Sequence, residues 1–141
     1  MKRLFVTLGL AVMLISNSSF ASSDPQDALS TFYKKFGNAE NVTWSDVDGM
    51  TRIGFTIHGQ EQFAYYNNND LVVLAKRIDV TELPSSLQKE LSSHYGDYTK
   101  SELYAVESNG AKEYYITLDN SSKHLVLRGI KKWAVFLKEK K

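Results

Sequence analysis

The sequence predicts an α+β fold of tandem helix-plus-antiparallel-strands units, with the helices packed on one face of an antiparallel sheet. Two observations predict it. Two amphipathic helical segments are each followed by a series of short β-rich segments that turn signals separate. The same order occurs twice, because Pro25 matches Pro84 at an offset of 59 residues and Phe55 matches Ile116 at an offset of 61. This recurrence is one of pattern, since few letters are identical.

The first half is expected to begin with a helix at Asp24-Pro25, where aspartate suits the N-cap and proline the first helical position. Ala28, Phe32 and Phe36 then recur at helical spacing. Alternating β-rich segments follow, and they predict strands around 42–44, 51–58, 61–67 and 70–78.

The second half repeats this plan from Leu83-Pro84 onward. Leu87, Leu91 and Tyr95 lie on one helical face, and they predict the second helix. The segment after Gly129 fits a helix and a strand equally well by periodicity, and the repeat favours a strand because its counterpart reads "DLVVLA". Strands are therefore predicted near 100–107, 112–119, 122–128 and 131–137.

Residues 1–21 have the pattern of a secretory signal peptide. Lys2 and Arg3 precede an apolar run over 4–15, and Ser19-Phe20-Ala21 provides a small-residue cleavage site. The expected mature chain, 22–141, is long enough for one domain, and its two pseudo-repeats are expected at about 24–80 and 81–141. We expect no stable membrane span after cleavage, because the apolar run is shorter than a bilayer-spanning helix.

The amino-acid composition limits the classes of partner and the cellular compartments that are expected for the protein. Without Lys2 and Arg3 the chain keeps 15 basic and 16 acidic residues, which does not indicate a nucleic-acid-binding protein. The chain has no cysteine, so the exported protein is expected in a bacterial periplasm or outside the cell and not as a disulfide-stapled scaffold. The basic stretch from Lys131 to Lys141 is expected to be a solvated surface strand, and contact with anionic lipid or nucleic acid is its alternative.

Three segments resemble one known family. They are "FGNAENVTW", "GFTIHGQEQFAYYNNNDLVVLAKRI" and "ELPSSLQKELSSHYGDY", with an Asn-Ala-x-x-Val-x-Trp start, an aromatic-Tyr pair before a polar turn, and a Leu-Pro helix opening. In these features the chain is similar to the PepSY-like, beta-lactamase-inhibitor-like domains of secreted bacterial proteins. The resemblance implies tandem α+β units and the binding or inhibition of other proteins.

The sequence does not predict a catalytic or metal site. Asn67 to Asp70 supplies oxygen ligands but lacks the ligand rhythm of a calcium loop, so we interpret it as a hairpin turn. His58, His94 and His124 have no zinc-site spacing, and we expect solvated or capping roles for them. No cofactor or metal is therefore expected. A small hydrolase whose site assembles from distant residues is the alternative to a binding protein.

The main functional prediction is a non-catalytic protein-binding module that inhibits or chaperones an unknown secreted or envelope protein. Its predicted binding surface is the sheet face away from the helices. A two-residue turn at Gly59-Gln60 would pair Phe55 with Ala64, and a turn at Asn120-Ser121 would pair Leu118 with Lys123. The next turn, after β-rich segment 61–67, would place Val72 and Leu74 beside Phe63 and Tyr65. Together these turns predict six partner-binding residues, Phe63, Tyr65, Val72, Leu74, Tyr115 and Val126. A three-residue loop over 59–61 would instead turn Phe63 and Tyr65 inward.

Overall fold

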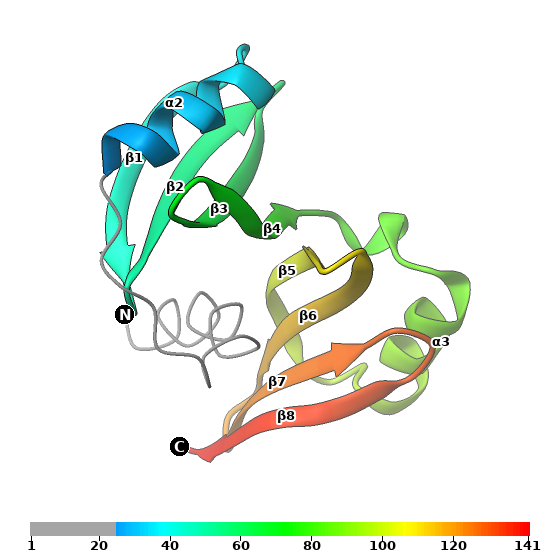
Figure 1. Ribbon diagram of the computed structural model, residues 1–141. Helices are drawn as coiled ribbons and strands as arrows, with labels where there is room; N and C mark the ends of the chain where they lie inside the picture. Colours follow the sequence, from blue (N-terminus) through cyan, green and yellow to red (C-terminus); the bar gives the residue numbers. More distant parts are fainter. Residues whose placement is uncertain (1–24) are drawn as a thin grey trace. The chain divides into compact units, whose positions relative to one another are not determined.

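Residues 25–141 of the protein are described here from a computed structural model (Figure 1). The predicted signal peptide therefore lies outside the described residues. The elements, in chain order, are α2 (Pro25–Lys35), β1 (Glu40–Val47), β2 (Met50–Ile57), β3 (Gln60–Asn67), β4 (Asp70–Arg77), the 3-10 turn η1 (Val80–Glu82), α3 (Ser85–His94), β5 (Thr99–Ser108), β6 (Ala111–Asp119), β7 (Lys123–Gly129) and β8 (Trp133–Lys140).

The prediction of tandem helix-plus-strands units is wrong at the level of the sheet. All eight strands belong to one antiparallel sheet, in which each strand neighbours the next along the chain. The helices are short, with 11 residues in α2 and 10 in α3, and most of the fold is strand. The pairing of β4 with β5 left no local signal, because η1 and α3 separate these strands in the sequence.

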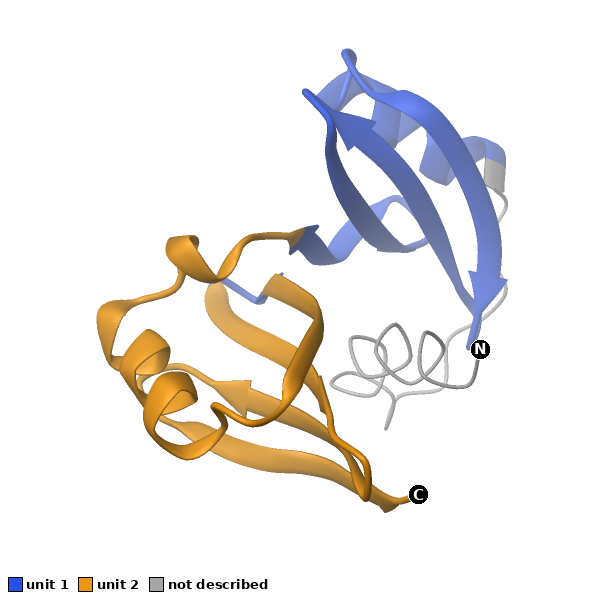
Figure 2. Cartoon of the chain, turned by 180° about the vertical axis from the view of Figure 1, so that it is seen from behind, with its two compact units in different colours: residues 1–76, 107–110 blue, residues 77–106, 111–141 orange. Residues whose placement is uncertain are grey.

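The chain divides into two compact units (Figure 2). Unit 1 ends at Lys76 and also includes residues 107–110. Unit 2 comprises 77–106 and 111–141. Each unit contains one helix that packs against its own strands, and each has its own hydrophobic cluster.

In unit 1, α2 packs against strands β2 and β3 through aromatic side chains. The ring centres of Phe32 and Phe55 lie 4.8 Å apart in an edge-to-face arrangement, and Phe36 lies 4.9 Å from Phe55. The helical spacing of the sequence thus places its apolar residues on one face, as predicted. The buried residues of this cluster are Ala28, Phe32, Phe36, Ile53, Phe55, Ala64 and Tyr66.

In unit 2, α3 packs against one face of the strands β5 to β8. Leu87 and Leu91 are buried in the middle of the helix. The predicted strand after Gly129 is confirmed as β8, and its first residue, Trp133, joins the cluster. The buried residues of this cluster are Leu83, Leu87, Leu91, Leu103, Ile116, Leu118, Leu125, Leu127 and Trp133.

The β2–β3 hairpin turns one residue earlier than predicted. Its central residues are His58 and Gly59, whose φ angles of 51° and 80° suit a type I′ turn. Phe55 consequently pairs with Gln62 and not with Ala64. A shift of two residues in the partner leaves every side chain on its predicted face.

The β6–β7 hairpin has a longer loop than predicted. The side-chain oxygen of Asn120 accepts hydrogen bonds from the backbone N–H groups of Ser122 and Lys123, at 2.9 and 2.7 Å. These bonds stabilise the loop, and Leu118 pairs with Leu125 instead of Lys123. The predicted turn after β3 is confirmed, because Asn67 pairs directly with Asp70.

Candidate functional site

Each unit has a second sheet face, here called the helix-free face, that lies opposite the face on which its helix packs. Ala64 and Tyr66 belong to the cluster under α2, so the alternation along β3 places Phe63 and Tyr65 on the helix-free face of unit 1. Ile116 belongs to the cluster under α3, so the preceding Tyr115 is on the helix-free face of unit 2.

On the helix-free face of unit 1, an arginine lies next to two aromatic rings. Arg52 and Tyr65 are directly opposite each other on β2 and β3. The guanidinium carbon of Arg52 is 5.4 Å from the centre of the Phe63 ring, which is the geometry of a cation–π contact. Burial raises the pKa of the Tyr65 hydroxyl, and the charge and hydrogen bond of Arg52 oppose this rise.

Gly54 allows the Phe63 ring to lie close to the sheet. The two residues are opposite each other on β2 and β3. A Cβ atom on Gly54 would lie 3.3 Å from the nearest Phe63 ring carbon and 3.2 Å from the hydroxyl of Thr43. A larger residue at position 54 would therefore push the ring away from the strand.

On the helix-free face of unit 2, Tyr115 lies within a polar and aromatic cluster. Its hydroxyl donates to Oε2 of Glu113 at 3.2 Å, and Nη2 of Arg128 donates to the other carboxylate oxygen at 3.0 Å. The Phe136 ring meets Tyr115 edge-on, with 5.7 Å between ring centres. Burial and the Glu113 carboxylate raise the pKa of Tyr115, while Arg128 lowers it, so the hydroxyl stays a hydrogen-bond donor.

Each unit thus has its own cluster on its helix-free face, and the two clusters contain the same residue types. One tyrosine, one arginine and one phenylalanine meet on each helix-free face, and these types can supply both apolar area and charge-assisted hydrogen bonds. The arginines and Phe136 were missed from sequence, because only cross-strand register brings them next to the tyrosines. The clusters consist of Arg52, Phe63 and Tyr65 in unit 1 and of Tyr115, Arg128 and Phe136 in unit 2.

The six predicted partner-binding residues differ in solvent exposure. Phe63, Val72 and Leu74 are partly exposed, whereas Tyr65, Tyr115 and Val126 are buried. Val126 is opposite Thr117, two pairs along the strands from Tyr115 and Arg128. No comparison tests whether any of the six binds a partner, so this assignment stays a prediction.

The predicted position of Leu74 beside Phe63 is wrong. A bulge at Val72 changes the β3–β4 register, so that Val73 is opposite Tyr65 and Ala75 opposite Phe63. Leu74 is opposite Ala64 and packs against the cluster under α2. The hairpin turn alone could not reveal this bulge.

A histidine–carboxylate pair was also missed from sequence. Asp119 and His124 are opposite each other at the end of the β6–β7 hairpin, with 2.8 Å between Oδ1 and Nδ1. The ammonium of Lys141 lies 3.3 Å from the same Asp119 oxygen. The second ring nitrogen of His124, Nε2, is buried, and among residues 25–141 it has no hydrogen-bond partner.

Metal and membrane features were searched over the part of the chain that the structure describes. Within residues 25–141 no group of three or more His, Asp or Glu side chains is arranged to hold a metal ion. None of the described helices is both long enough and apolar enough to cross a membrane.

Known proteins resemble this chain in fold. A BLIP-like protein from Bacteroides fragilis has a TM-score of 0.66 and 13% identity, covering 88% of this chain and 90% of its own. A DUF2874 family protein from Bacteroides ovatus has a TM-score of 0.70 and 19% identity, covering 85% and 89%. A presumed periplasmic protein from Bacteroides eggerthii has a TM-score of 0.74 and 13% identity, covering 84% and 90%.

These likenesses support the beta-lactamase-inhibitor-like part of the resemblance seen in the sequence, as a fold. They do not include a PepSY-like protein, so that part stays a prediction. No family model matches the chain, and no curated protein matches it significantly.

Proposed function

We propose that the chain is a non-catalytic protein-binding module that contacts its partner through the helix-free faces of its two units. One observation carries this proposal: a tyrosine, an arginine and a phenylalanine meet on each of these faces. Tyrosine and arginine are enriched among residues that dominate binding energy, and a large aromatic ring adds contact area at low entropic cost.

The geometry gives each cluster an ordered core and a more accessible rim. Tyr65 and Tyr115 are buried and therefore fixed, whereas Phe63 and Phe136 remain partly exposed at the edge of the same clusters. The Arg128 side chain is 45% exposed although it pairs with Glu113. A partner can thus contact the phenylalanines and Arg128 without the buried tyrosines having to move.

The finer proposal is that the module is exported, has PepSY-like ancestry, and inhibits or chaperones a secreted or envelope protein. The signal-like residues 1–21 support export. The presumed periplasmic neighbour and the BLIP-like neighbour share the fold, and their descriptions are compatible with a binding protein in that compartment. A hydrolase receives less support, because within the described residues no hydroxyl is hydrogen-bonded to the buried Nε2 of His124.

Affinity capture from the native envelope and culture medium tests the proposal. Immobilised wild-type protein should retain a protein that soluble wild-type competitor displaces. A Phe63→Ala/Phe136→Ala variant should retain much less of it while still unfolding in one cooperative thermal transition above the temperature of the assay. If the variant captured as much partner protein as the wild type does, the proposed role of the helix-free faces would be contradicted.

A further inference from the structure

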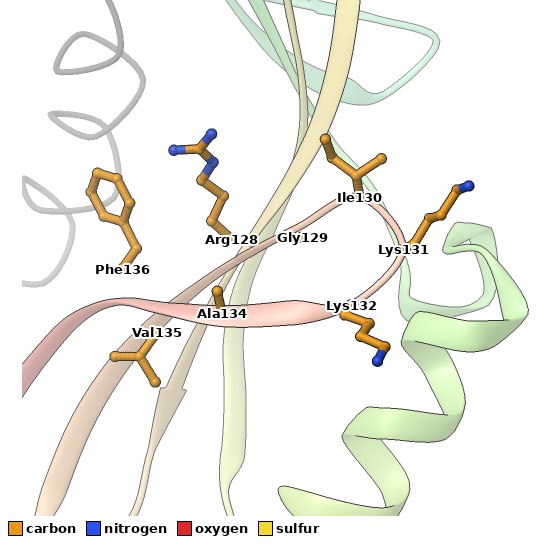
Figure 3. Close-up of a pocket in the computed structure, with 8 residues that line it drawn as sticks. All are labelled: Arg128, Gly129, Ile130, Lys131, Lys132, Ala134, Val135 and Phe136. Carbon is orange, nitrogen blue, oxygen red and sulfur yellow. The ribbon is translucent and has the colours of Figure 1, made fainter.

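The β7–β8 hairpin of unit 2 forms a hollow of about 350 Å³, here called the hairpin groove (Figure 3). Its main lining residues are Arg128, Ile130, Lys131, Lys132, Val135 and Phe136. Figure 3 shows the side chains of Arg128 and Phe136 on one side of the hairpin, and Lys132 and Val135 on the other. Since Arg128 and Phe136 also belong to the Tyr115 cluster, the groove adjoins the helix-free face.

The groove combines apolar surface with basic charge. Ile130 is 55% exposed and Val135 is 53% exposed, and within residues 25–141 only Tyr33 and Trp44 are comparable large exposed hydrophobic residues. Three lining side chains are basic, and no lining residue is acidic. Arg128 is paired with Glu113, so Lys131 and Lys132 supply the positive charge that no lining carboxylate offsets. This charge is complementary to a ligand with an apolar anchor and acidic neighbours.

The hairpin is held in place by α3, so the groove is formed before any ligand binds. The indole N–H of Trp133 donates to the Leu87 carbonyl at 3.0 Å, and its backbone N–H donates to Glu90 at 3.1 Å. Gly129 lies under the Trp133 ring with no room for a Cβ atom, because that atom would be 2.8 Å from the ring. A preformed loop loses less conformational entropy on binding than a mobile one.

Glu113 orients Arg128 on the other side of the groove. The 3.0 Å contact fixes one guanidinium nitrogen, while the side chain remains partly open to solvent. An arginine held in this way can offer its remaining N–H groups to a carboxylate in a defined geometry.

We propose that the hairpin groove binds an acidic segment of the protein partner, with an aliphatic side chain of that segment packed against the exposed Ile130. This inference rests on the proposed function, because it names the chemistry of one part of the partner. A peptide segment fits better than a membrane surface, since the apolar residues line a hollow instead of projecting from a flat patch.

Fluorescence polarisation of a short labelled peptide of alternating glutamate and leucine tests the inference. A peptide with lysine in place of glutamate serves as the ligand control. Wild-type protein should bind the acidic peptide and not the basic one. A Lys131→Glu/Lys132→Glu variant should bind it about tenfold more weakly or worse, because two favourable charges become repulsive.

A matched variant distinguishes binding in the groove from non-specific electrostatic attraction between the protein and the acidic peptide. Lys138→Glu/Lys140→Glu makes the same change in net charge on exposed residues of β8 outside the groove. It should leave the peptide affinity within about twofold, because exposed charges farther away are screened by salt. An Ile130→Ser variant, which keeps all charges, should also weaken binding.

The outcomes distinguish this inference from the proposed function. Equal losses in the two lysine variants, or no binding of the acidic peptide, would overturn the inference. Binding to phosphatidylglycerol vesicles that competes with the peptide for Lys131 and Lys132 would overturn it in favour of a membrane site. In each case Phe63→Ala alone, which lies in unit 1 outside the groove, would still test partner capture independently through a helix-free face.

Discussion

Gly129 is the residue at which one added methyl group meets the most resistance. A Cβ atom there would approach the Trp133 ring to 2.8 Å and the backbone oxygen of Lys132 to 2.9 Å. We expect Gly129→Ala to lower the free energy of unfolding by about 1–3 kcal/mol, as overpacking usually does. Urea denaturation measures this.

Gly37→Ala provides the control for Gly129→Ala. Its new Cβ would meet the Tyr33 carbonyl oxygen at 3.5 Å, an ordinary contact, so stability should change by less than about 0.5 kcal/mol. If Gly129→Ala were as harmless as Gly37→Ala, the Trp133 anchor of the hairpin groove would be wrong.

Tyr115 makes stability depend on pH in the alkaline range. Its folded pKa lies above the model-compound value of 10.0, so the folded state keeps the phenolic proton after the unfolded state has lost it. Its contribution is complete below pH 10 and is lost as pH rises toward the folded pKa, with a slope of up to about 1.4 kcal/mol per pH unit. Tyr115→Phe should remove this slope.

Urea unfolding of Tyr115→Phe and of wild type, at pH 8 and at several values above pH 10, measures the difference. Tyr33→Phe is the control, because Tyr33 is 49% exposed on α2. A Tyr115→Phe variant that loses stability above pH 10 as steeply as wild type would show that Tyr115 is not held neutral by its surroundings.

At the residue scale, sequence predicted the apolar positions better than the polar partners. The helical spacing of Ala28, Phe32 and Phe36 predicted which residues are buried under α2, and this was correct. Arg52 beside Tyr65 could not be predicted, because their contact depends on a register between two strands. Local spacing contains no information on that register beyond the turn that joins the strands.

At the scale of elements, the Asp119–His124 pair closes the β6–β7 hairpin. Asp119 contacts both the buried imidazole and the ammonium of Lys141. Asp119→Ala would leave His124 buried without its carboxylate, and we expect a loss of about 1–3 kcal/mol of stability. Thermal unfolding measures it, with the exposed Ser121→Ala as control. Equal melting temperatures for the two variants would mean that the pair does not stabilise the hairpin.

The positions of the elements were largely predictable, and their pairings were not. Pro25 and Pro84 predicted both helix starts to within one residue, and Asn109-Gly110 predicted the β5–β6 turn. Both predicted registers were wrong by two residues. His58 adopts a left-handed conformation that histidine seldom uses, and the Asn120 side chain extends its loop through two hydrogen bonds. Sequence favours neither the earlier two-residue turn at His58-Gly59 nor the longer loop after Asp119 over the turns predicted.

At the scale of the whole molecule, export is a prediction that rests on residues 1–21. Cleavage after Ser19-Phe20-Ala21 would leave Ser22 as the first residue of the mature chain. Intact mass of the protein from the periplasmic or culture fraction should correspond to residues 22–141. A soluble species that retains Met1 would contradict export by this route.

The continuity of the sheet also belongs to this scale, and sequence could not predict it. The repeat of helix and strands in the sequence does not specify whether the two sets of strands remain separate, and the tandem-unit fold predicted from it is wrong. Backbone hydrogen bonds between β4 and β5 join them into one sheet, although α3 intervenes in the chain. Such bonds involve no particular side chains, so the sequence shows no trace of them.

The central claim is that the helix-free faces bind a protein partner, and calorimetric affinity for the captured partner tests it most directly. The comparison needs wild type, Phe63→Ala/Phe136→Ala, and Tyr33→Ala/Trp44→Ala. The last variant removes two aromatic side chains that are about half exposed and lie away from the helix-free faces. Tyr33 is on α2, and Trp44 is on β1, opposite Ile53 of β2. We predict that the phenylalanine variant binds at least about tenfold more weakly and that the control variant binds like wild type. Equal affinity in the phenylalanine variant, or an equal loss in both variants, would contradict the claim.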